Sequence, residues 1–422
     1  MLPRRLILAF FGALLCMPSA AGDLRGFAQR CLQAKAEAAP VRILQFGDSH
    51  LALPSVQRLF RGIFQAQFGD GGPGFGLPWV RPQAGLRAQA SSGWHRPSRP
   101  MPGADAGLQD TWLEAGRAGE VASLDGPFSQ VRIHFEGLPG GGSVKILVDG
   151  KPIEDVSLQA NTPELRVFER TLPGSRRLEV VTTGSGPVRL LGVSLEASAG
   201  AVHSVMAFNG FQAAWMLAIP EGLFAAQVRA EAPDLVILAF GTNEANDKLF
   251  DAELYRRDLE ALLTRFELAA PTAALALVGP PDARLPRSLP GALEAVIEVQ
   301  RAVSARHGAF FWDQRAAMGG AGSIAAWNQS GLANRDLVHF TQAGYQRLAK
   351  AFLEPFFQHL AQLTGSAGAF QVAWKPEVVP AQSQTAGHPI YVFKTGDGRT
   401  IITDDPANVA GEQGVWEGRA PE

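Results

Sequence analysis

Hydrophobic patterns typical of strands alternate along the chain with patterns typical of helices. The apolar run Val41–Phe46 predicts a buried strand, and apolar positions at helical spacing predict a helix from Pro54 to Phe68. After Gly200 the same rhythm returns, with apolar strands at 235–240, 274–278 and 309–312 and helices at 213–230, 251–267 and 291–306. Alternation of this kind predicts an α/β fold with a parallel sheet.

Between about 116 and 196 the pattern changes to short β segments. They lie at 131–135, 144–148, 165–168, 178–182 and 188–195, with turn signals such as Asp149-Gly150 between them. Regular spacing and alternating faces predict a small β-sandwich inserted into the α/β domain. Such an insertion is tolerated when its two ends lie close together.

The two ends of the chain have their own character. Arg4 and Arg5 precede the apolar run 6–17 and small residues, which predicts a signal peptide over 1–21 and cleavage after Ala21. We therefore expect an exported chain without an integral membrane segment, and no disulfide, because Cys31 would then be alone. At the other end the sequence predicts a linker over 366–388 and a β-hairpin tail over 389–422.

Composition excludes some classes of protein. The chain has 422 residues, of which 46% are hydrophobic and 18% charged, so it can bury more than one core. Its formal net charge of −2 shows no excess of basic residues of the kind that binds nucleic acid. The glycine-rich run 69–76 is followed by no Gly-Lys-Ser or Gly-Lys-Thr, so we interpret it as a structural loop and not a phosphate cradle.

Ser49 stands in the strand-to-helix turn Gly47-Asp48-Ser49-His50. At the carboxyl ends of strands in open α/β sheets, such turns line the ligand crevice, which suits a nucleophile. An ordinary helix cap is the alternative interpretation, because Asp and Ser are common N-cap residues.

Two later motifs bear on this choice. In Asp336-Leu337-Val338-His339 the spacing lets the carboxylate hold imidazole Nδ1–H while Nε2 faces a hydroxyl, although a capping Asp beside a surface His has the same pattern. The run 233–240 predicts a covered strand that ends just before Asn243. The Asn243 amide could therefore serve as an oxyanion donor in the same crevice.

Taken in order, Gly47-Asp48-Ser49, Phe208-Asn209-Gly210, Gly241-Thr242-Asn243 and Asp336-Leu337-Val338-His339 resemble the signature blocks of SGNH (GDSL-type) hydrolases. The resemblance implies a three-layer α/β/α domain, formed by 22–75 and 200–365. It also implies Ser49 as nucleophile, His339 as base, Asp336 as its orienter, and an oxyanion hole from Ser49, Gly210 and Asn243. No metal or cofactor is expected. His50 and Glu244 depart from the commonest pattern, which has leucine and aspartate there.

Within that family, the insert over 76–199 and the Gly-Pro-Gly-Phe-Gly loop resemble periplasmic peptidoglycan O-acetylesterases with a carbohydrate-binding-like module. The implied function is a periplasmic serine esterase that removes O-acetyl groups from an envelope polysaccharide, peptidoglycan or an exopolysaccharide. Trp94 and Trp112 are candidates for stacking on sugar, or for packing between the domains. Two alternatives stay open: a polysaccharide O-acetyltransferase with the same triad, and a non-catalytic glycan-binding assembly protein.

Overall fold

The computed structural model describes residues 22–81, 83, 86–97 and 107–370, together with the backbone of three short strands between 391 and 417. The predicted signal peptide and most of the predicted linker lie outside the described residues. Within the described part, no helix is both long enough and apolar enough to cross a membrane.

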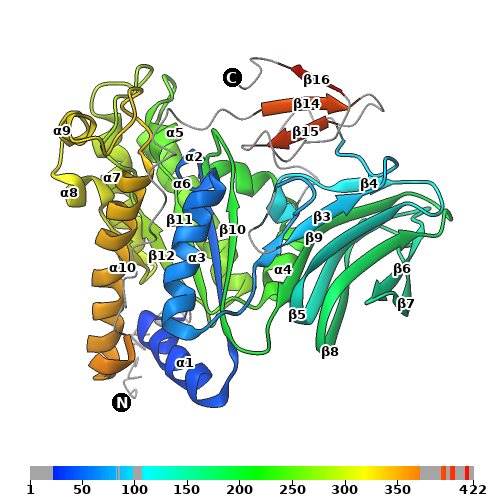
Figure 1. Ribbon diagram of the computed structural model, residues 1–422. Coiled ribbons are helices and arrows are strands. Elements are labelled where there is room, and N and C mark those ends of the chain that lie inside the picture. Colours follow the sequence, from blue (N-terminus) through cyan, green and yellow to red (C-terminus); the bar gives the residue numbers. More distant parts are fainter. Residues whose placement is uncertain are drawn as a thin grey trace, which may run out of the picture.

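A five-stranded parallel sheet forms the centre of the α/β domain (Figure 1). Its order is β10 (Gly200–Ala207), β1 (Pro40–Gly47), β11 (Leu235–Ala239), β12 (Ala274–Val278) and β13 (Phe310–Trp312). Because β1 pairs with β10 on one side and β11 on the other, the chain winds in both directions from β1. The predicted α/β class is confirmed.

Helices cover both faces of this sheet. One hydrophobic core packs against α1 (Leu24–Glu37), α3 (Pro54–Phe68) and α10 (Gln342–Thr364). A second core lies against α4 (Glu221–Glu231), α6 (Ala252–Ala269) and α7 (Ala292–Arg306). Short helices complete the domain: α2 (Ser49–Ala52), η2 (Ala213–Ala218), α5 (Thr242–Ala245), α8 (Gln314–Met318) and α9 (Ser323–Gln329). The result is a three-layer α/β/α domain.

Proline explains one difference from the predicted elements. A single helix was expected over 213–230, but Pro220 separates η2 from α4 and stands as the N-cap of α4. Proline has no N–H to donate to the preceding turn, so the helix cannot continue through it.

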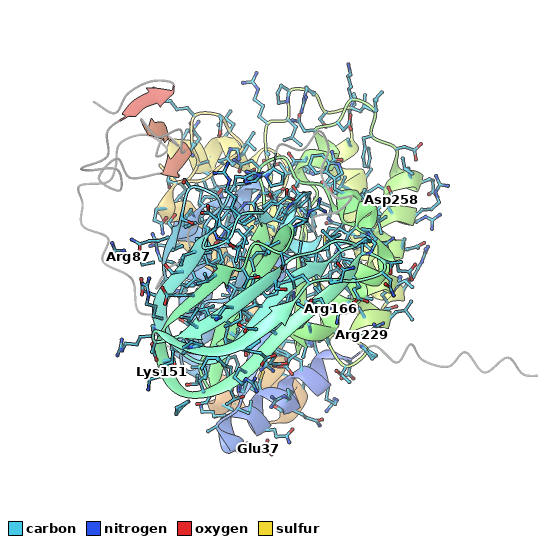
Figure 2. All side chains as sticks on the ribbon, turned by 90° about the vertical axis from the view of Figure 1, so that its right-hand side faces the viewer. Glu37, Arg87, Lys151, Arg166, Arg229 and Asp258 are labelled. Carbon is cyan, nitrogen blue, oxygen red and sulfur yellow. The ribbon has the colours of Figure 1, made fainter. Side chains whose placement is uncertain are left out.

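The insert is an eight-stranded antiparallel sheet. Its strands are β2 (Gly74–Gly76), β3 (Arg87–Ala90), β4 (Leu113–Ala115), β5 (Val121–Gly137), β6 (Ser143–Val148), β7 (Lys151–Ser157), β8 (Glu164–Thr182) and β9 (Val188–Glu196). Pairing of β5 with β8 shifts register between Asp125 and Gln130, and segments on both sides of the shift contribute to one core. The sequence predicted a β-sandwich, and the insert instead forms one continuous sheet. Figure 2 views it with Lys151 and Arg166 exposed.

The two ends of the insert lie against each other. Gly71 N–H donates to the carbonyl of Ala201 at 3.0 Å, and Ala201 N–H donates to the carbonyl of Gly69 at 2.8 Å. A Cβ on Gly71 would come within 2.5 Å of the Ala201 carbonyl carbon. The glycine-rich run is therefore required for the close approach of two backbones.

A buried polar layer joins the insert to the α/β domain. Arg132 on β5 contacts Glu231 on α4 at 3.4 Å and Glu196 on β9 at 3.3 Å, and His134 Nε2 lies 3.0 Å from Glu231. Glu196 also pairs with Arg42 on β1 at 2.9 Å. Charged groups buried together in this way tolerate little displacement, so they fix how the insert sits on the domain.

The carboxyl-terminal part differs from the prediction in two details. Phe370, in η3 (Ala367–Phe370), is buried with its ring centroid 6.3 Å from that of Phe68, so the α/β domain continues past the expected end at 365. Beyond it, β14 (Tyr391–Thr395) and β15 (Thr400–Thr403) form the expected hairpin, and β16 (Gly414–Glu417) adds a third strand beside β14.

Candidate active site

Four segments distant in sequence meet at the carboxyl edge of the parallel sheet. Ser49 follows β1, Gly210 follows β10, Asn243 follows β11, and His339 lies just before α10. Because neighbouring parallel strands end at the same edge, their connecting turns share one crevice. The topology therefore places the nucleophile turn between the two candidate oxyanion segments.

Ser49, His339 and Asp336 form a continuous hydrogen-bonded relay. Ser49 Oγ lies 2.8 Å from His339 Nε2, and His339 Nδ1 lies 2.8 Å from Asp336 Oδ2. With Nδ1 held as the donor to the carboxylate, Nε2 is free to accept the serine proton. The arrangement is that of a serine hydrolase triad.

The loop before α10 fixes the carboxylate of this triad. Asp336 Oδ1 accepts the N–H groups of Val338 and His339, both at 3.0 Å, while Leu337, between Asp336 and Val338, takes a left-handed φ of 57°. Partial burial alone would raise the pKa of Asp336, but these hydrogen bonds and the nearby imidazole lower it below its usual value. Asp336 is therefore ionised when it orients His339.

Two buried side chains flank the nucleophile. Asp48 Oδ1 accepts the His50 N–H at 2.9 Å as the N-cap of α2, and burial raises the pKa of Asp48 to about 6. His50 Nδ1 lies 3.3 Å from the Tyr345 hydroxyl, and burial lowers the pKa of His50 to about 3. Its ring centroid is 5.2 Å from that of His339. A neutral His50 adds no repulsion when His339 becomes protonated.

The candidate oxyanion donors come from two linked segments. Gly210 is exposed with φ 77°, and the next residue, Phe211, accepts from Asn243 Nδ2 at 3.1 Å. The second Nδ2 hydrogen of Asn243 points toward Asp48 Oδ2 at 3.5 Å, the long limit of a hydrogen bond, so an oxyanion can take the place of that contact. Glu244 links the same two segments, a contact that sequence reasoning missed because it noted Glu244 only as a departure from the family pattern.

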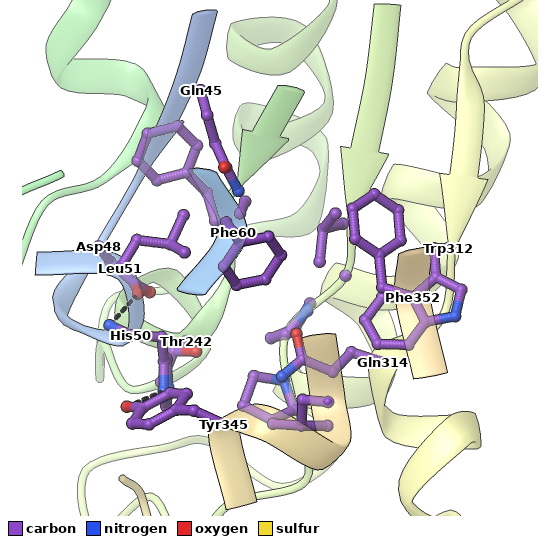
Figure 3. A pocket seen from close by; sticks show the side chains of 17 residues that line it. Gln45, Asp48, His50, Leu51, Phe60, Thr242, Trp312, Gln314, Tyr345 and Phe352 are labelled. Atoms are coloured by element: carbon purple, nitrogen blue, oxygen red, sulfur yellow. Dashed lines mark hydrogen bonds between the residues drawn. The ribbon is translucent and has the colours of Figure 1, made fainter. Parts of the chain in front are cut away.

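A cavity of about 40 Å³ lies behind the nucleophile turn (Figure 3). Asp48, His50 and Thr242 contribute to its wall, but Ser49 and Asn243 do not. Phe60, Trp312 and Phe352 close its far side. The cavity therefore lies beneath the turn, and it is not the surface on which Ser49 would meet an ester.

The structure decides between the two roles left open for the tryptophans, sugar stacking and packing, in favour of packing. Trp94 is only 6% exposed and belongs to the core of the insert. Trp112 is also 6% exposed, packs with Leu191 and Leu223, and has the Arg189 guanidinium 4.9 Å from its ring centroid. Neither ring offers a free face to a sugar. Because Leu223 belongs to α4, Trp112 packs between the insert and the α/β domain.

Comparison with known proteins agrees with this geometry. Residues 174–347 match the model of the GDSL-like lipase/acylhydrolase family. This range includes the segments that carry Gly210, Asn243 and Asp336–His339. A sequence search among curated proteins finds no match. The family match covers less than half of the chain, and together with the hydrogen-bonded triad it supports a serine esterase.

Solved structures extend the likeness to the insert. A peptidoglycan O-acetylesterase structure superposes with a TM-score of 0.69 at 24% identity, covering 81% of this chain and 98% of that one. A family two carbohydrate esterase from Cellvibrio japonicus covers 66% of this chain and 99% of its own, at 12% identity and a TM-score of 0.29. An acetylxylan esterase mutant from Geobacillus stearothermophilus covers 37% and 72%, at 20% identity and a TM-score of 0.30.

Proposed function

We propose that this protein is an exported serine esterase that removes O-acetyl groups from a cell-envelope polysaccharide, with peptidoglycan as the first candidate. The observation that carries the proposal is the relay in which Ser49 Oγ and Asp336 Oδ2 each lie 2.8 Å from opposite nitrogens of His339. The same site suits acyl transfer from any small ester whose carbonyl reaches Ser49.

The reaction follows from these contacts. Ser49 Oγ attacks the acetyl carbonyl while its proton passes to His339 Nε2, and Asp336 stabilises the imidazolium that forms. The carbonyl oxygen becomes an oxyanion that the N–H groups of Ser49 and Gly210 and the Asn243 amide can receive. The bond from the acetyl carbon to the sugar oxygen then breaks, and His339 gives its proton to that oxygen, which leaves as a sugar hydroxyl. Water, activated by His339, hydrolyses the acetyl-serine and releases acetate.

Three observations support a polymeric, O-acetylated substrate. Gly210 is solvent-exposed, so the crevice is accessible from outside. The insert joins β10 at the amino end of that strand, but its Arg81 guanidinium lies 3.9 Å from the ring centroid of Phe208, two residues before Gly210, so part of the insert reaches the edge of the crevice. One solved structure, which covers 81% of this chain, is that of a peptidoglycan O-acetylesterase.

Transfer of acetyl to another glycan is the competing reaction. Both reactions share the acetyl-serine and differ only in whether water or a sugar hydroxyl accepts the acetyl group. A purely structural role as a glycan-binding assembly protein fits less well, because all three triad members stand in reactive geometry.

The test is to incubate the purified protein with O-acetylated peptidoglycan, with and without a de-O-acetylated acceptor glycan. Hydrolysis predicts free acetate in an amount that the acceptor does not reduce. Acetate that falls as acetylated acceptor rises would identify a transferase, and no acetate and no transfer would contradict the proposal. For the proposed export to the periplasm, the first residue of protein from that fraction should be Gly22.

A further inference from the structure

The two outer donors of the oxyanion hole come from different strands. Gly210 follows β10 and Asn243 follows β11, and β1 lies between these strands in the sheet. An oxyanion hole stabilises charge only when its donors are held at fixed positions before the reaction. Contacts within the protein must therefore hold residues 209–213 and residues 241–245 at a fixed distance from each other.

Glu244 makes this connection with both of its carboxylate oxygens. Oε1 accepts the N–H of Ala213 at 2.9 Å, and Oε2 accepts the N–H of Gly241 at 3.0 Å. The side chain is buried, with 6% exposed. One contact closes the amino-terminal turn of α5, as a glutamate at the third helical position commonly does, and the other crosses to the segment that carries Gly210.

The crossing contact has a counterpart in the opposite direction. Asn243 Nδ2 donates to the carbonyl of Phe211 at 3.1 Å, so each segment supplies a donor to the other. Together these two hydrogen bonds hold residues Phe211–Ala213 against α5. Gly210 directly precedes that stretch, which ties its position to that of Asn243.

We propose that Glu244 is a positioning residue that sets the separation of Gly210 and Asn243 in the oxyanion hole. The inference rests on the proposed function, since it concerns the same hole. The Glu244 carboxyl group presents an acceptor oxygen to each N–H group, and burial raises its pKa to about 7. A glutamine amide has one acceptor oxygen and turns an NH₂ group toward the other donor. An aspartate is one methylene shorter, so it can close α5 but cannot also reach Ala213.

The sharpest variant is Glu244→Asp, which removes the crossing bond and keeps the acid. Loss of one oxyanion donor lowers kcat by about 10²–10³-fold, so a displaced donor should lower kcat by roughly 10–100-fold on a small acetyl ester. KM should change less than about twofold, because ground-state binding does not use the hole. Glu244→Gln should show the same split between kcat and KM.

A double-variant cycle separates positioning from general stability. If Glu244 acts through Asn243, adding Glu244→Asp to Asn243→Ala should slow the enzyme by much less than it slows the wild type. Glu231→Gln is the matched control: Glu231 is a buried glutamate at the insert interface, and its loss should lower Tm without lowering kcat on the small ester.

Affinity for methylboronic acid gives a readout that needs no turnover, because its tetrahedral serine adduct places an oxygen in the hole. We expect weaker binding to Glu244→Asp than to the wild type. Unchanged kcat and unchanged boronate affinity in Glu244→Asp, or fully additive losses in the cycle, would overturn the inference. If the wild type binds boronate but releases no acetate from any acetyl ester, the proposed function fails, and the boronate series still decides the role of Glu244. No boronate binding to the wild type would overturn both.

Discussion

Ser49 Oγ lies 2.8 Å from Nε2 of His339, although 290 positions separate the two residues in the sequence. The contact depends on the parallel sheet, which brings the end of β1 to the loop before α10. It therefore requires the α/β domain to close correctly around an insert of more than a hundred residues.

Replacement of Asp336 tests the orientation of His339. Asp336→Asn should lower kcat on a small acetyl ester by about 10³–10⁴-fold, since the amide favours the wrong tautomer of the imidazole. The Asn oxygen can still accept the N–H groups of Val338 and His339, so Tm should change little. A variant with wild-type kcat would remove Asp336 from the relay.

The pKa of Asp48 predicts a pH dependence of stability. Burial raises this pKa from 3.8 to about 6, so the folded state holds the proton longer than the unfolded state does. The stabilisation is therefore complete below the unfolded pKa and is lost as pH rises from about 4 to 6. Across that window the wild type should lose about 2–3 kcal/mol of unfolding free energy relative to Asp48→Asn.

Denaturant unfolding of the wild type and of Asp48→Asn at a series of pH values measures the difference in their unfolding free energies. Contributions of the other titrating groups are common to both proteins and cancel in this difference. A difference that is constant from pH 4 to 7 would mean that the pKa of Asp48 is the same in the folded and unfolded states. Burial of the nucleophile turn would then not raise the pKa of Asp48.

The buried charges at the insert interface should matter far more than exposed ones. Arg132→Ala leaves Glu231 buried without its guanidinium partner and leaves Glu196 with Arg42 alone, and should destabilise the protein by about 3–5 kcal/mol. The exposed pair of Arg170 and Glu154 offers a matched control, and Arg170→Ala should lower stability by less than about 1 kcal/mol. Equal losses measured by denaturant unfolding would show that the interface layer carries no special weight.

The sequence predicted most of the fold, and the reasons are local. The proline that begins α3 is encoded within that helix, and α3 lies where the pattern placed it. The break at Pro220 was missed because apolar spacing continues across it. The edge strand β7 was missed because nearly all of its residues are exposed, so it lacks a hydrophobic pattern.

The site was predictable where a motif carried the chemistry. Ser49, Asp336 and His339 could be named because their residue types and spacing serve one reaction, and the structure brings them together. The bond from Ala213 to Glu244 could not be inferred, because it depends on where two separate strands end. Burial of Trp94 was equally inaccessible, since irregular sequence around a tryptophan does not reveal which surface covers it.

Burial of the tryptophans changes what their replacement should do. Trp94→Ala should destabilise the insert by about 3–5 kcal/mol, as large-to-small changes in a core do. Activity on polymer and on a small soluble ester should then fall in parallel, together with Tm. A selective loss on the polymer at unchanged Tm would restore Trp94 as a glycan contact.

The central claim is that Ser49 becomes acetylated by an O-acetylated glycan. Mass spectrometry of protein quenched during reaction with O-acetylated peptidoglycan tests it directly, with Ser49→Ala as the control. We predict one acetyl group on the peptide that contains Ser49, none on the variant, and acetate release only by the wild type. Acetate release by Ser49→Ala at the wild-type rate, or an acetyl group on another residue in its place, would contradict the account.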